Sequence, residues 1–407
     1  MRSMEYKEAE KLLLQNVTPV ETENVTTEDL FSRILAEDLT AEMDVPHFDR
    51  SPYDGYAFKA EDTKDAGESN PVTLRVIENI RAGQTPEKEV VSGTAIRLMT
   101  GAPLPAGADA ICKYEDTDFT DETVNIKRKY SAGDNIIWHG EDIKKGTVLV
   151  KRGEVVDAAV MGIVSSLGMT GLKVYKKPVA ALISTGDELA DIDEGLKPGK
   201  IRNSNRYILS GALESIGFET VYAGHASDDI GDIQGRILSA EKMGDIIIST
   251  GGVSAGDYDL VPDAMQKAGY EIIVDGIDMK PGMACVFGVK KGRLMLALSG
   301  NPASALTNLQ CICYPALKKL AGSEHHDHRL IMMRLKNDYK KSRRGIRFLR
   351  GVLSIEDGTA VFTAPERQGN IVISSAALCN AYACLPEGTE PLRAGDTVEG
   401  FTVNGRN

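Results

Sequence analysis

Between residues 173 and 325, short aliphatic runs alternate with segments that have helical periodicity. Apolar runs of this length that end in glycine or polar turns are typical of buried strands, and strands alternating with helices indicate a largely parallel sheet. We therefore expect a three-layer α/β domain with ligands beyond the carboxyl ends of its strands. The expected strands are Val179–Ser184, Glu219–Ala223, Asp245–Ser249 and Leu294–Ser299, and the expected helices are Asn205–Ile216, Asp232–Met243, Leu260–Ala268 and Pro302–Leu320.

The regions on either side have other patterns. Residues 1–44 and the segment Val155–Leu167 show helical spacing, and Thr26-Thr-Glu-Asp29 resembles a capping box before an apolar helical face at Leu30–Leu35. Residues 45–141 and 326–407 place short apolar runs between Gly, Pro and Asp turns, which predicts two β-rich domains. Their expected strands are Thr73–Ile77, Thr94–Leu98, Ala110–Lys113, Thr123–Ile126, Arg329–Met333, Phe348–Leu353, Ala360–Thr363 and Ala381–Leu385.

Composition narrows the class of protein. A chain of 407 residues predicts two to four domains, and a net charge of −12 argues against a general nucleic-acid binder. The six cysteines form no CxxC pair, so we interpret them as reduced, mostly buried thiols of a cytoplasmic protein. Met1–Glu10 is polar and no apolar run approaches 18 residues, so we expect neither a signal peptide nor a membrane span.

Two glycine turns follow predicted strands. Thr250-Gly-Gly-Val-Ser-Ala-Gly-Asp-Tyr-Asp259 comes after one strand and Ser184-Thr-Gly-Asp-Glu188 after another. Exposed peptide N–H groups beside carboxylates suit a phosphate held together with a divalent cation. A glycine turn after a strand is also common as simple fold punctuation, so each turn alone is a weak signal.

Several carboxylates lie just past these strand ends, where they can converge on one rim. We expect Glu188, Asp228 and Asp259, with Asp257 nearby, to make a Mg²⁺–phosphate site. The alternative is that each acid caps a helix or turn, and this reading is strongest for Asp228 because Ser227-Asp-Asp229 precedes a helix. Asn301-Pro-Ala-Ser304 likewise indicates either an anion site at a helix start or an ordinary Asn cap.

Other polar segments leave two readings open. In the Pro46–Ala57 segment, His47, Asp49 and Asp54 are either ligands or substrate contacts, or parts of a rigid loop whose aspartates bind backbone N–H groups. Thr100 starts a stiff Pro/Gly loop and either donates to a ligand or caps the turn. His325-His-Asp-His328 has the composition of a metal tract, but at a domain boundary we favour surface histidines. A basic cluster is either a solvated loop or a phosphate-receiving surface; its members are Lys340, Lys341, Arg343, Arg344, Arg347 and Arg350.

Taken together, these motifs resemble the molybdopterin molybdenumtransferase family, to which the gephyrin E domain is related. The resemblance spans essentially the whole chain in the family's order and spacing. The motifs that carry it are Phe48-Asp-Arg-Ser-Pro-Tyr-Asp-Gly-Tyr-Ala57, Met99-Thr-Gly-Ala-Pro-Leu-Pro-Ala-Gly107, Gly140-Glu-Asp142, Ser184–Glu188, Thr250–Asp259 and Gly300-Asn-Pro302.

The resemblance implies a fold, a reaction and partners. The fold is multi-domain α/β plus β: a discontinuous elongated helical domain (1–44 and 142–172), a β-rich domain (45–141), a molybdopterin-binding α/β domain (173–325) and a C-terminal β-barrel-like domain (326–407). The implied enzyme inserts molybdenum from molybdate into adenylylated molybdopterin and releases AMP with the help of Mg²⁺. It is expected to be a cytoplasmic homodimer. A molybdopterin adenylyltransferase and recipient apoenzymes are its candidate partners.

The resemblance also assigns site residues. It implies Glu188, Asp228 and Asp259 as metal-binding catalytic carboxylates, with Asp54, Thr100 and Asp142 supplied to the same cleft by the partner subunit. The implied substrate-binding residues are Ser184, Thr185, Gly251, Gly252, Ser254, Lys280, Asn301, Pro302 and Arg350.

The sequence departs from the family pattern at three places. It has Lys280-Pro-Gly-Met283-Ala284 where the family commonly has Lys-Pro-Gly-Lys-Pro, and Ser299-Gly-Asn-Pro302 where Pro-Gly-Asn-Pro is usual. Gln368-Gly-Asn370 stands where a Gly-Ser-Gly-like turn is frequent. The alternatives that stay open are a tungstate-using paralogue, a molybdopterin adenylyltransferase and a non-catalytic pterin carrier or scaffold.

Overall fold

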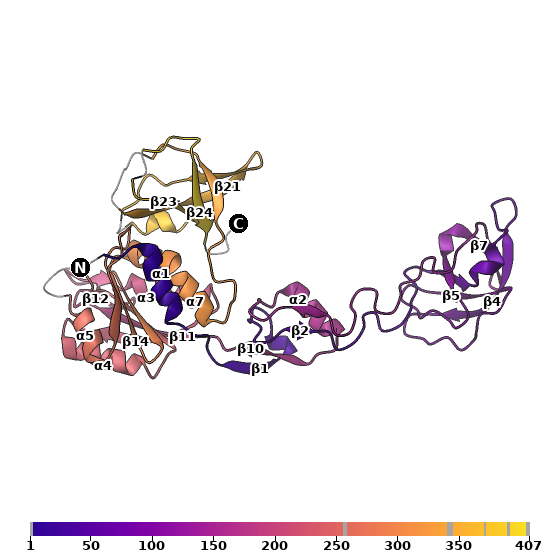
Figure 1. Cartoon of the computed structure of the whole chain (residues 1–407), viewed down its shortest axis with the longest axis horizontal. Helices are drawn as coiled ribbons and strands as arrows, with labels where there is room; N and C mark the ends of the chain where they lie inside the picture. Colours follow the sequence, from indigo (N-terminus) through magenta and orange to yellow (C-terminus); the bar gives the residue numbers. More distant parts are fainter. Residues whose placement is uncertain (1–2, 255–258, 340–344, 370–371, 389–390, 404–407) are drawn as a thin grey trace. The chain divides into compact units, whose positions relative to one another are not determined.

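The computed structural model describes residues 3–254, 259–339, 345–369, 372–388 and 391–403 (Figure 1). Contacts within the chain divide it into two compact units. Unit 1 comprises Met1–Glu37, Arg152–Ala158 and Gly171–Asn407, and unit 2 comprises Asp38–Lys151 and Ala159–Thr170. Each unit is therefore built from segments that are distant in sequence.

The largest sheet of unit 1 has six strands in the order β14-β11-β15-β19-β18-β16. The first four are parallel, and they confirm the four predicted strands; β18 runs antiparallel to both its neighbours. Strands β16 and β18 were not predicted, because acidic residues end the apolar run of the first and Gly288 interrupts that of the second. The bounds are β11 Val179–Thr185, β14 Glu219–Ala226, β15 Ile246–Thr250, β16 Glu271–Asp275, β18 Cys285–Lys290 and β19 Arg293–Leu298.

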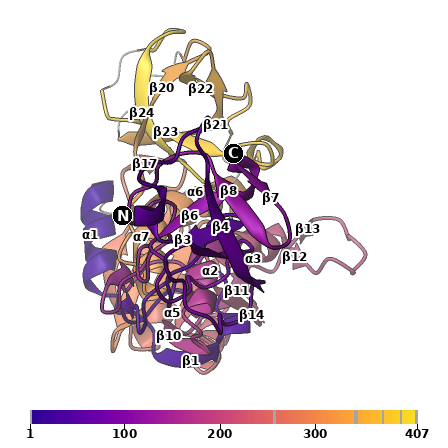
Figure 2. The same ribbon diagram turned by 90° about the vertical axis from the view of Figure 1, so that its right-hand side faces the viewer.

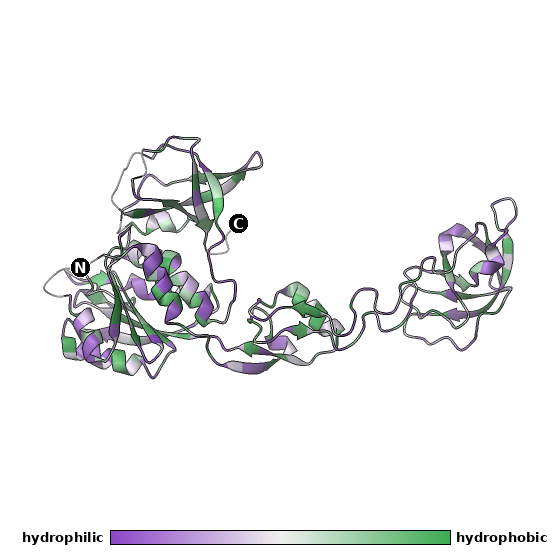
Figure 3. Cartoon of the chain, viewed as in Figure 1, coloured by the Kyte–Doolittle hydropathy of each residue, from purple (hydrophilic) through white to green (hydrophobic). Residues whose placement is uncertain are grey.

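Helices cover both faces of this sheet, as predicted. Along β11, Ala180 and Leu182 face one apolar layer and Ala181 and Ile183 the other, which is the alternation a pleated strand imposes. Figure 3 shows the strands as largely apolar and the helices as mixed in hydropathy. The first layer contains α1 Tyr6–Gln15, α3 Ser204–Glu214, α6 Pro302–Thr307 and α7 Tyr314–Leu320, and the second contains α4 Ile230–Ala240 and α5 Val261–Lys267.

The predicted helix Pro302–Leu320 is interrupted. A buried π-helical segment, η4 Asn308–Cys313, separates α6 from α7. Pro315 follows at the start of α7, and because proline has no N–H it cannot donate to the carbonyl of Cys311 in an α-helical ladder. The wider π-helical turn lies directly before this residue.

The C-terminal region of unit 1 is a closed barrel, as predicted. Its strands follow the order β21-β22-β20-β24-β23, and pairing between β21 and β23 closes the ring (Figure 2). A short strand from the α/β domain, β17 Met279–Lys280, also pairs with β21. The barrel bounds are β20 Ile331–Leu335, β21 Ile346–Glu356, β22 Thr359–Thr363, β23 Ala381–Leu385 and β24 Thr397–Thr402.

Unit 2 contains the other β-rich region. A six-stranded sheet in the order β6-β3-β5-β4-β8-β7 encloses an apolar core that includes Phe58 and Tyr56, both with no exposed surface. The predicted strands of this region are all present. Their bounds are β3 Gly55–Phe58, β4 Val72–Ile80, β5 Thr94–Leu98, β6 Ala110–Lys113, β7 Thr117–Phe119 and β8 Thr123–Ile126; β2 Leu39–Thr40 pairs β9 Val148–Val150 beside α2 Ala158–Ser166.

The predicted helix across Leu30–Leu35 is wrong. The capping-box residues Thr26–Asp29 form one 3₁₀ turn, η1 Thr27–Asp29, after strand β1 Thr22–Thr26. Ser32 then takes a positive φ of 64°, which ends any right-handed helix. Ile34 and Leu35 make isolated bridges to Val155 and Val174 instead, while β1 pairs with β10 Gly171–Tyr175.

Candidate functional site

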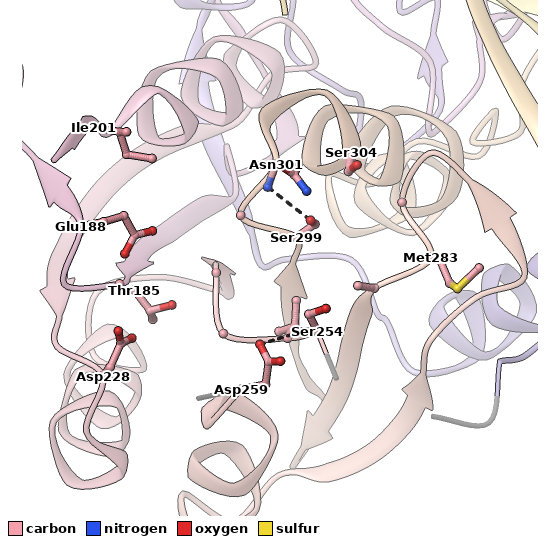
Figure 4. A pocket seen from close by; sticks show the side chains of 17 residues that line it. Thr185, Glu188, Ile201, Asp228, Ser254, Asp259, Met283, Ser299, Asn301 and Ser304 are labelled. Atoms are coloured by element: carbon pink, nitrogen blue, oxygen red, sulfur yellow. Dashed lines mark hydrogen bonds between the residues drawn. The ribbon is translucent and has the colours of Figure 1, made fainter. Parts of the chain in front are cut away.

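A pocket lies at the carboxyl edge of the parallel strands, and we call it the edge pocket (Figure 4). Its volume is about 580 Å³, which is sufficient for a nucleotide-sized ligand. The loops that follow β11, β14, β15 and β19 all contribute to it, as the strand pattern predicted. Its lining residues are Thr185, Gly186, Glu188, Ile201, Asp228, Gly251, Gly252, Val253, Ser254, Asp259, Gly282, Met283, Ala284, Ser299, Gly300, Asn301 and Ser304.

The three predicted carboxylates Glu188, Asp228 and Asp259 all line this pocket. The loops that carry the first two are joined by hydrogen bonds from backbone N–H groups to carboxylates: Asp187 N donates to Asp228 Oδ2 at 3.3 Å, and Asp228 N donates to Asp187 Oδ1 at 3.4 Å. Asp259 Oδ1 accepts from Ser254 N at 2.7 Å. The carboxylates therefore come from three separate strand ends and meet at one rim.

Asp228 does not cap helix α4, although the sequence favoured that interpretation. The N-cap of α4 is Asp229, whose carboxylate accepts from Asp232 N at 2.9 Å. Asp232 in turn accepts from the backbone and the hydroxyl of Ser227, which lowers its pKa. The capping task is thus performed by neighbours, and the side chain of Asp228 reaches the pocket.

The glycine turn after β15 needs glycine at two positions. Gly251 and Gly252 have φ values of 96° and 64°, in the left-handed region that favours glycine. A Cβ on Gly251 would lie 2.6 Å from the carbonyl oxygen of Thr185, so the two strand-end turns are closely packed. The hydroxyl of Thr185 donates to Thr250 O at 3.1 Å and ties β11 to β15 at this point.

The opposite wall is polar but uncharged. Asn301 makes no side-chain cap bond to α6, although its N–H donates to Ser299 Oγ at 3.2 Å, and Ser304 also lines the wall. Ser304 belongs to the Asn301–Ser304 segment that the sequence indicated as a candidate anion site, and Ser299 was noted there as a departure from the family pattern. Ile201, which reaches the pocket from β13 Ile201–Arg202, had no signal.

Four of the predicted substrate-binding residues do not line the pocket. Ser184 is buried and bonded to Asn203, and Pro302 is the first residue of α6. Lys280 lies on β17 opposite Arg347 of β21. Arg350 is 2% exposed inside the barrel region. Among the described lining residues there is no Lys, Arg or His, and Met283 stands there with 41% exposure.

Unit 2 contains the remaining predicted site residues. Asp54 accepts from Thr100 twice, from its N–H at 2.6 Å and from its hydroxyl at 2.7 Å, and these bonds lower the pKa of the Asp54 carboxyl. Asp142 donates its N–H to Val45 O. Asp49 accepts from His139 N, in agreement with the interpretation that the aspartates of that segment bind backbone N–H groups.

The donor chemistry of the pocket fits Mg²⁺, because carboxylate and hydroxyl oxygens are its usual protein ligands. Within the described ranges, however, no three His, Cys, Asp or Glu side chains are close enough together to hold a metal ion. In the histidine tract, His328 stacks between Tyr314 and Phe401, and burial lowers its pKa to about 4. The prediction of surface histidines in this tract is correct for His325, whose imidazole pairs with Glu154.

Some predicted residues fall outside the described part of the chain. These are Asp257 of the glycine turn, four members of the basic cluster, and Asn370 of the C-terminal turn; the four are Lys340, Lys341, Arg343 and Arg344. Within the described residues, no helix has the length and apolarity required to cross a membrane.

Three family models match consecutive parts of the chain. They are the MoeA N-terminal region (domain I and II) at residues 4–168, a probable molybdopterin binding domain at 181–319, and the MoeA C-terminal region (domain IV) at 333–401.

Relatives and solved structures agree with these matches. A molybdopterin molybdenumtransferase of Bacillus subtilis is 36% identical over 95% of this chain and 91% of its own length. One from Staphylococcus aureus is 33% identical over 97% and 94%. A crystal structure of the MoeA molybdopterin biosynthesis protein of Pyrococcus horikoshii matches with a TM-score of 0.85 and 32% identity, covering 100% of both chains.

Proposed function

This chain belongs to the MoeA family of molybdopterin molybdenumtransferases, and we propose that it inserts molybdenum from molybdate into adenylylated molybdopterin and releases AMP. The observation that supports this most directly is the edge pocket, where three carboxylates and a tight glycine turn gather at the carboxyl ends of parallel strands. Such edges are where open α/β sheets bind nucleotides and phosphates.

The pocket residues have complementary tasks in this proposal. The backbone N–H groups of Gly251 and Gly252 and the hydroxyl of Ser254 would donate to phosphate oxygens. Thr185 and Asn301 would contact the ligand from the two facing walls, with Ser184 and Pro302 holding the turns beneath them. Glu188, Asp228 and Asp259 would orient the attacking water and stabilise the geometry of phosphoanhydride cleavage.

The charge of the residues that line the edge pocket is the reason for including a cation in this proposal. The described lining has three carboxylates and no cationic side chain, so a phosphate ligand would meet net repulsion without compensation. Glu188, Asp228 and Asp259 would supply carboxylate oxygens to Mg²⁺ together with the phosphate oxygens of the substrate, since the three side chains alone are not grouped closely enough to hold the ion. Bound there, Mg²⁺ would neutralise charge on the leaving phosphate.

Molybdate, the other substrate, needs positive charge of its own. We assign this task to Lys280 and Arg350. Nε and Nη1 of Arg350 are buried without a hydrogen-bond partner in the described part of the chain, and only Nη2 donates, to Val372 O at 3.3 Å. A buried guanidinium with free donors is suited to a planar or tetrahedral oxyanion.

We further propose a cytoplasmic homodimer in which Asp54, Thr100 and Asp142 of one subunit complete the cleft of its partner. The hydrogen bonds from Thr100 favour the ionised form of Asp54, as a cation or a substrate donor would require. An adenylyltransferase that supplies the substrate and apoenzymes that receive the cofactor are the proposed partners.

The test is AMP release from adenylylated molybdopterin with Mg²⁺ in three arms: molybdate, tungstate and neither anion. AMP that appears only with an oxyanion supports the proposal, and the faster arm identifies the metal. Asp259→Asn should abolish release, whereas the matched control Asp263→Asn, in the first turn of α5 and outside the pocket lining, should not. Tight substrate binding without AMP in any arm would indicate a pterin carrier instead.

A further inference from the structure

A second cavity in unit 1 shares no lining residue with the edge pocket. Its volume is about 350 Å³. Three segments surround it, near Ser32–Ile34, Tyr175–Pro178 and Glu214–Gly217. Its remaining lining residues are Val155, Lys318 and Ala321.

This cavity has a basic lining in a protein whose net charge is −12. Arg33, Lys176, Lys177 and Lys318 face one carboxylate, that of Glu214. Arg33 pairs with Glu23, and Lys176 pairs with Glu21 at 2.8 Å. Two of the four cations are therefore compensated.

The acid in the lining is engaged elsewhere. Glu214 Oε1 accepts from the hydroxyls of Ser210 and Thr220, each at 3.0 Å. The ammonium groups of Lys177 and Lys318 form no ion pair or hydrogen bond with any described residue. The cavity therefore has two cations without a protein counter-ion.

Lys318 is the less exposed of these two. It lies in the last turn of α7, is half-buried, and also lines an adjoining cavity of about 260 Å³. Burial lowers the pKa of its ammonium group, and no neighbouring charge contributes to that shift. A partly desolvated ammonium without a counter-ion is unfavourable, and a bound anion would offset that cost.

We propose that this cavity, the Lys318 cavity, binds a small phosphate monoester whose phosphate lies between Lys318 and Lys177. The apolar part of the ligand would contact Pro178, Ile216 and Ala321, which share the lining. The volume is in the range of small-molecule sites and larger than a bare ion requires. This site is independent of the proposed transferase reaction.

The test is calorimetric titration of the full-length protein with phenyl phosphate, a probe without the adenosine that the edge pocket would recognise. We expect saturable binding that weakens about ten- to a hundredfold in Lys318→Met, since a hydrogen-bonded charge is lost. Lys318→Arg keeps the charge and should bind within about threefold of the unmodified protein. Phenol, which lacks the anion, should not bind.

Two further variants locate the bound probe. Asp228→Asn alters the edge pocket and should leave phenyl phosphate binding unchanged, as should Lys267→Met, whose lysine lines neither cavity. Equal affinity in Lys318→Met, changed affinity in Asp228→Asn, or no binding by any protein would each overturn the proposal. Thermal melting of Lys318→Met verifies that the variant is folded.

Discussion

Two adjacent aspartates that follow β14 have different tasks, one in the fold and one in the edge pocket. Asp229 caps α4 through its bond to Asp232 N, while Asp228 lines the edge pocket. Side chains one residue apart at a helix start point in different directions, so one serves the fold and the other the ligand. Position in the sequence alone did not distinguish them.

Substituting these two residues separately should separate stability from activity. Asp229→Ala should lower stability by about 1 kcal/mol, the usual cost of a lost N-cap, with AMP release nearly unchanged. Asp228→Asn should lower AMP release at least about tenfold at an unchanged melting temperature. Thermal melting and AMP release measured on the same preparations provide the check. The reverse pattern would show that Asp228 is the structural residue.

Gly251 gives a second prediction for a single residue. Gly251→Ala places a Cβ 2.6 Å from Thr185 O at a φ of 96°, so two pocket walls must shift. We expect AMP release to fall at least about tenfold, as sub-ångström placement governs catalysis. Gly292→Ala is the matched control: its φ is 80° but nothing lies within 4 Å, so it should cost only the backbone strain. Equal losses of activity would contradict this account.

Glu10 gives a prediction about pH. Burial, together with Asp327, raises the pKa of its carboxyl to about 7 from an ordinary 4.5. The folded state therefore loses stability as pH rises from about 4.5 through 7, because the unfolded chain ionises Glu10 more easily. Buried His328, with a pKa of about 4, changes stability in the opposite direction over much of that interval.

Glu10→Gln isolates the first effect. The variant should melt at a higher temperature than the unmodified protein at pH 8 and at nearly the same temperature at pH 4.5. His328 is present in both proteins, so its contribution cancels in the difference. A difference in melting temperature that is independent of pH would show that the substitution acts through packing.

At the scale of elements, hydrophobic periodicity predicted the helices and strands that form mainly through apolar packing. The four parallel strands and most of the helices were predicted because each has one uninterrupted apolar pattern. Patterns that tertiary context overrides were missed: Ser32 ends the predicted helix at Leu30, and the π-helical turn before Pro315 breaks one helix into three parts. The pocket acids were found because strand ends are visible in sequence, whereas Ile201 enters from a two-residue strand.

The barrel offers a prediction at this scale. Asn380 joins the start of β23 to β21, accepting from Leu353 N at 2.7 Å and donating to Leu353 O at 3.1 Å. Asn380→Ala leaves both backbone groups unsatisfied in a nearly buried place and should cost about 1–3 kcal/mol. Asn125→Ala, which removes an exposed bond to Thr73, should cost less than about 1 kcal/mol. Thermal melting compares the two variants.

For the whole molecule, the proposed shared cleft predicts complementation between subunits. Asp54→Asn and Asp259→Asn proteins should each be inactive. If the two residues meet across a homodimer, a mixed dimer has one intact cleft, and an equal mixture refolded together should recover about a quarter of normal AMP release. If both residues act within one subunit, every cleft in the mixture contains a defect. The mixture would then stay inactive, and a monomer in light scattering would exclude the shared cleft directly.

The packing of α1 against α7 has a consequence for how the protein is made. Leu14 O accepts from Lys319 Nζ across 305 residues of chain, and Ala9 and Leu13 of α1 are fully buried in the finished core. At about 5–20 residues per second, a ribosome needs roughly 15–60 s to synthesise the partner helix after α1 has emerged. During that interval the apolar face of α1 lacks its final partner. Helix α1 leaves the ribosome well before α7, so it completes its packing late, and Ala9 and Leu13 stay uncovered until α7 arrives.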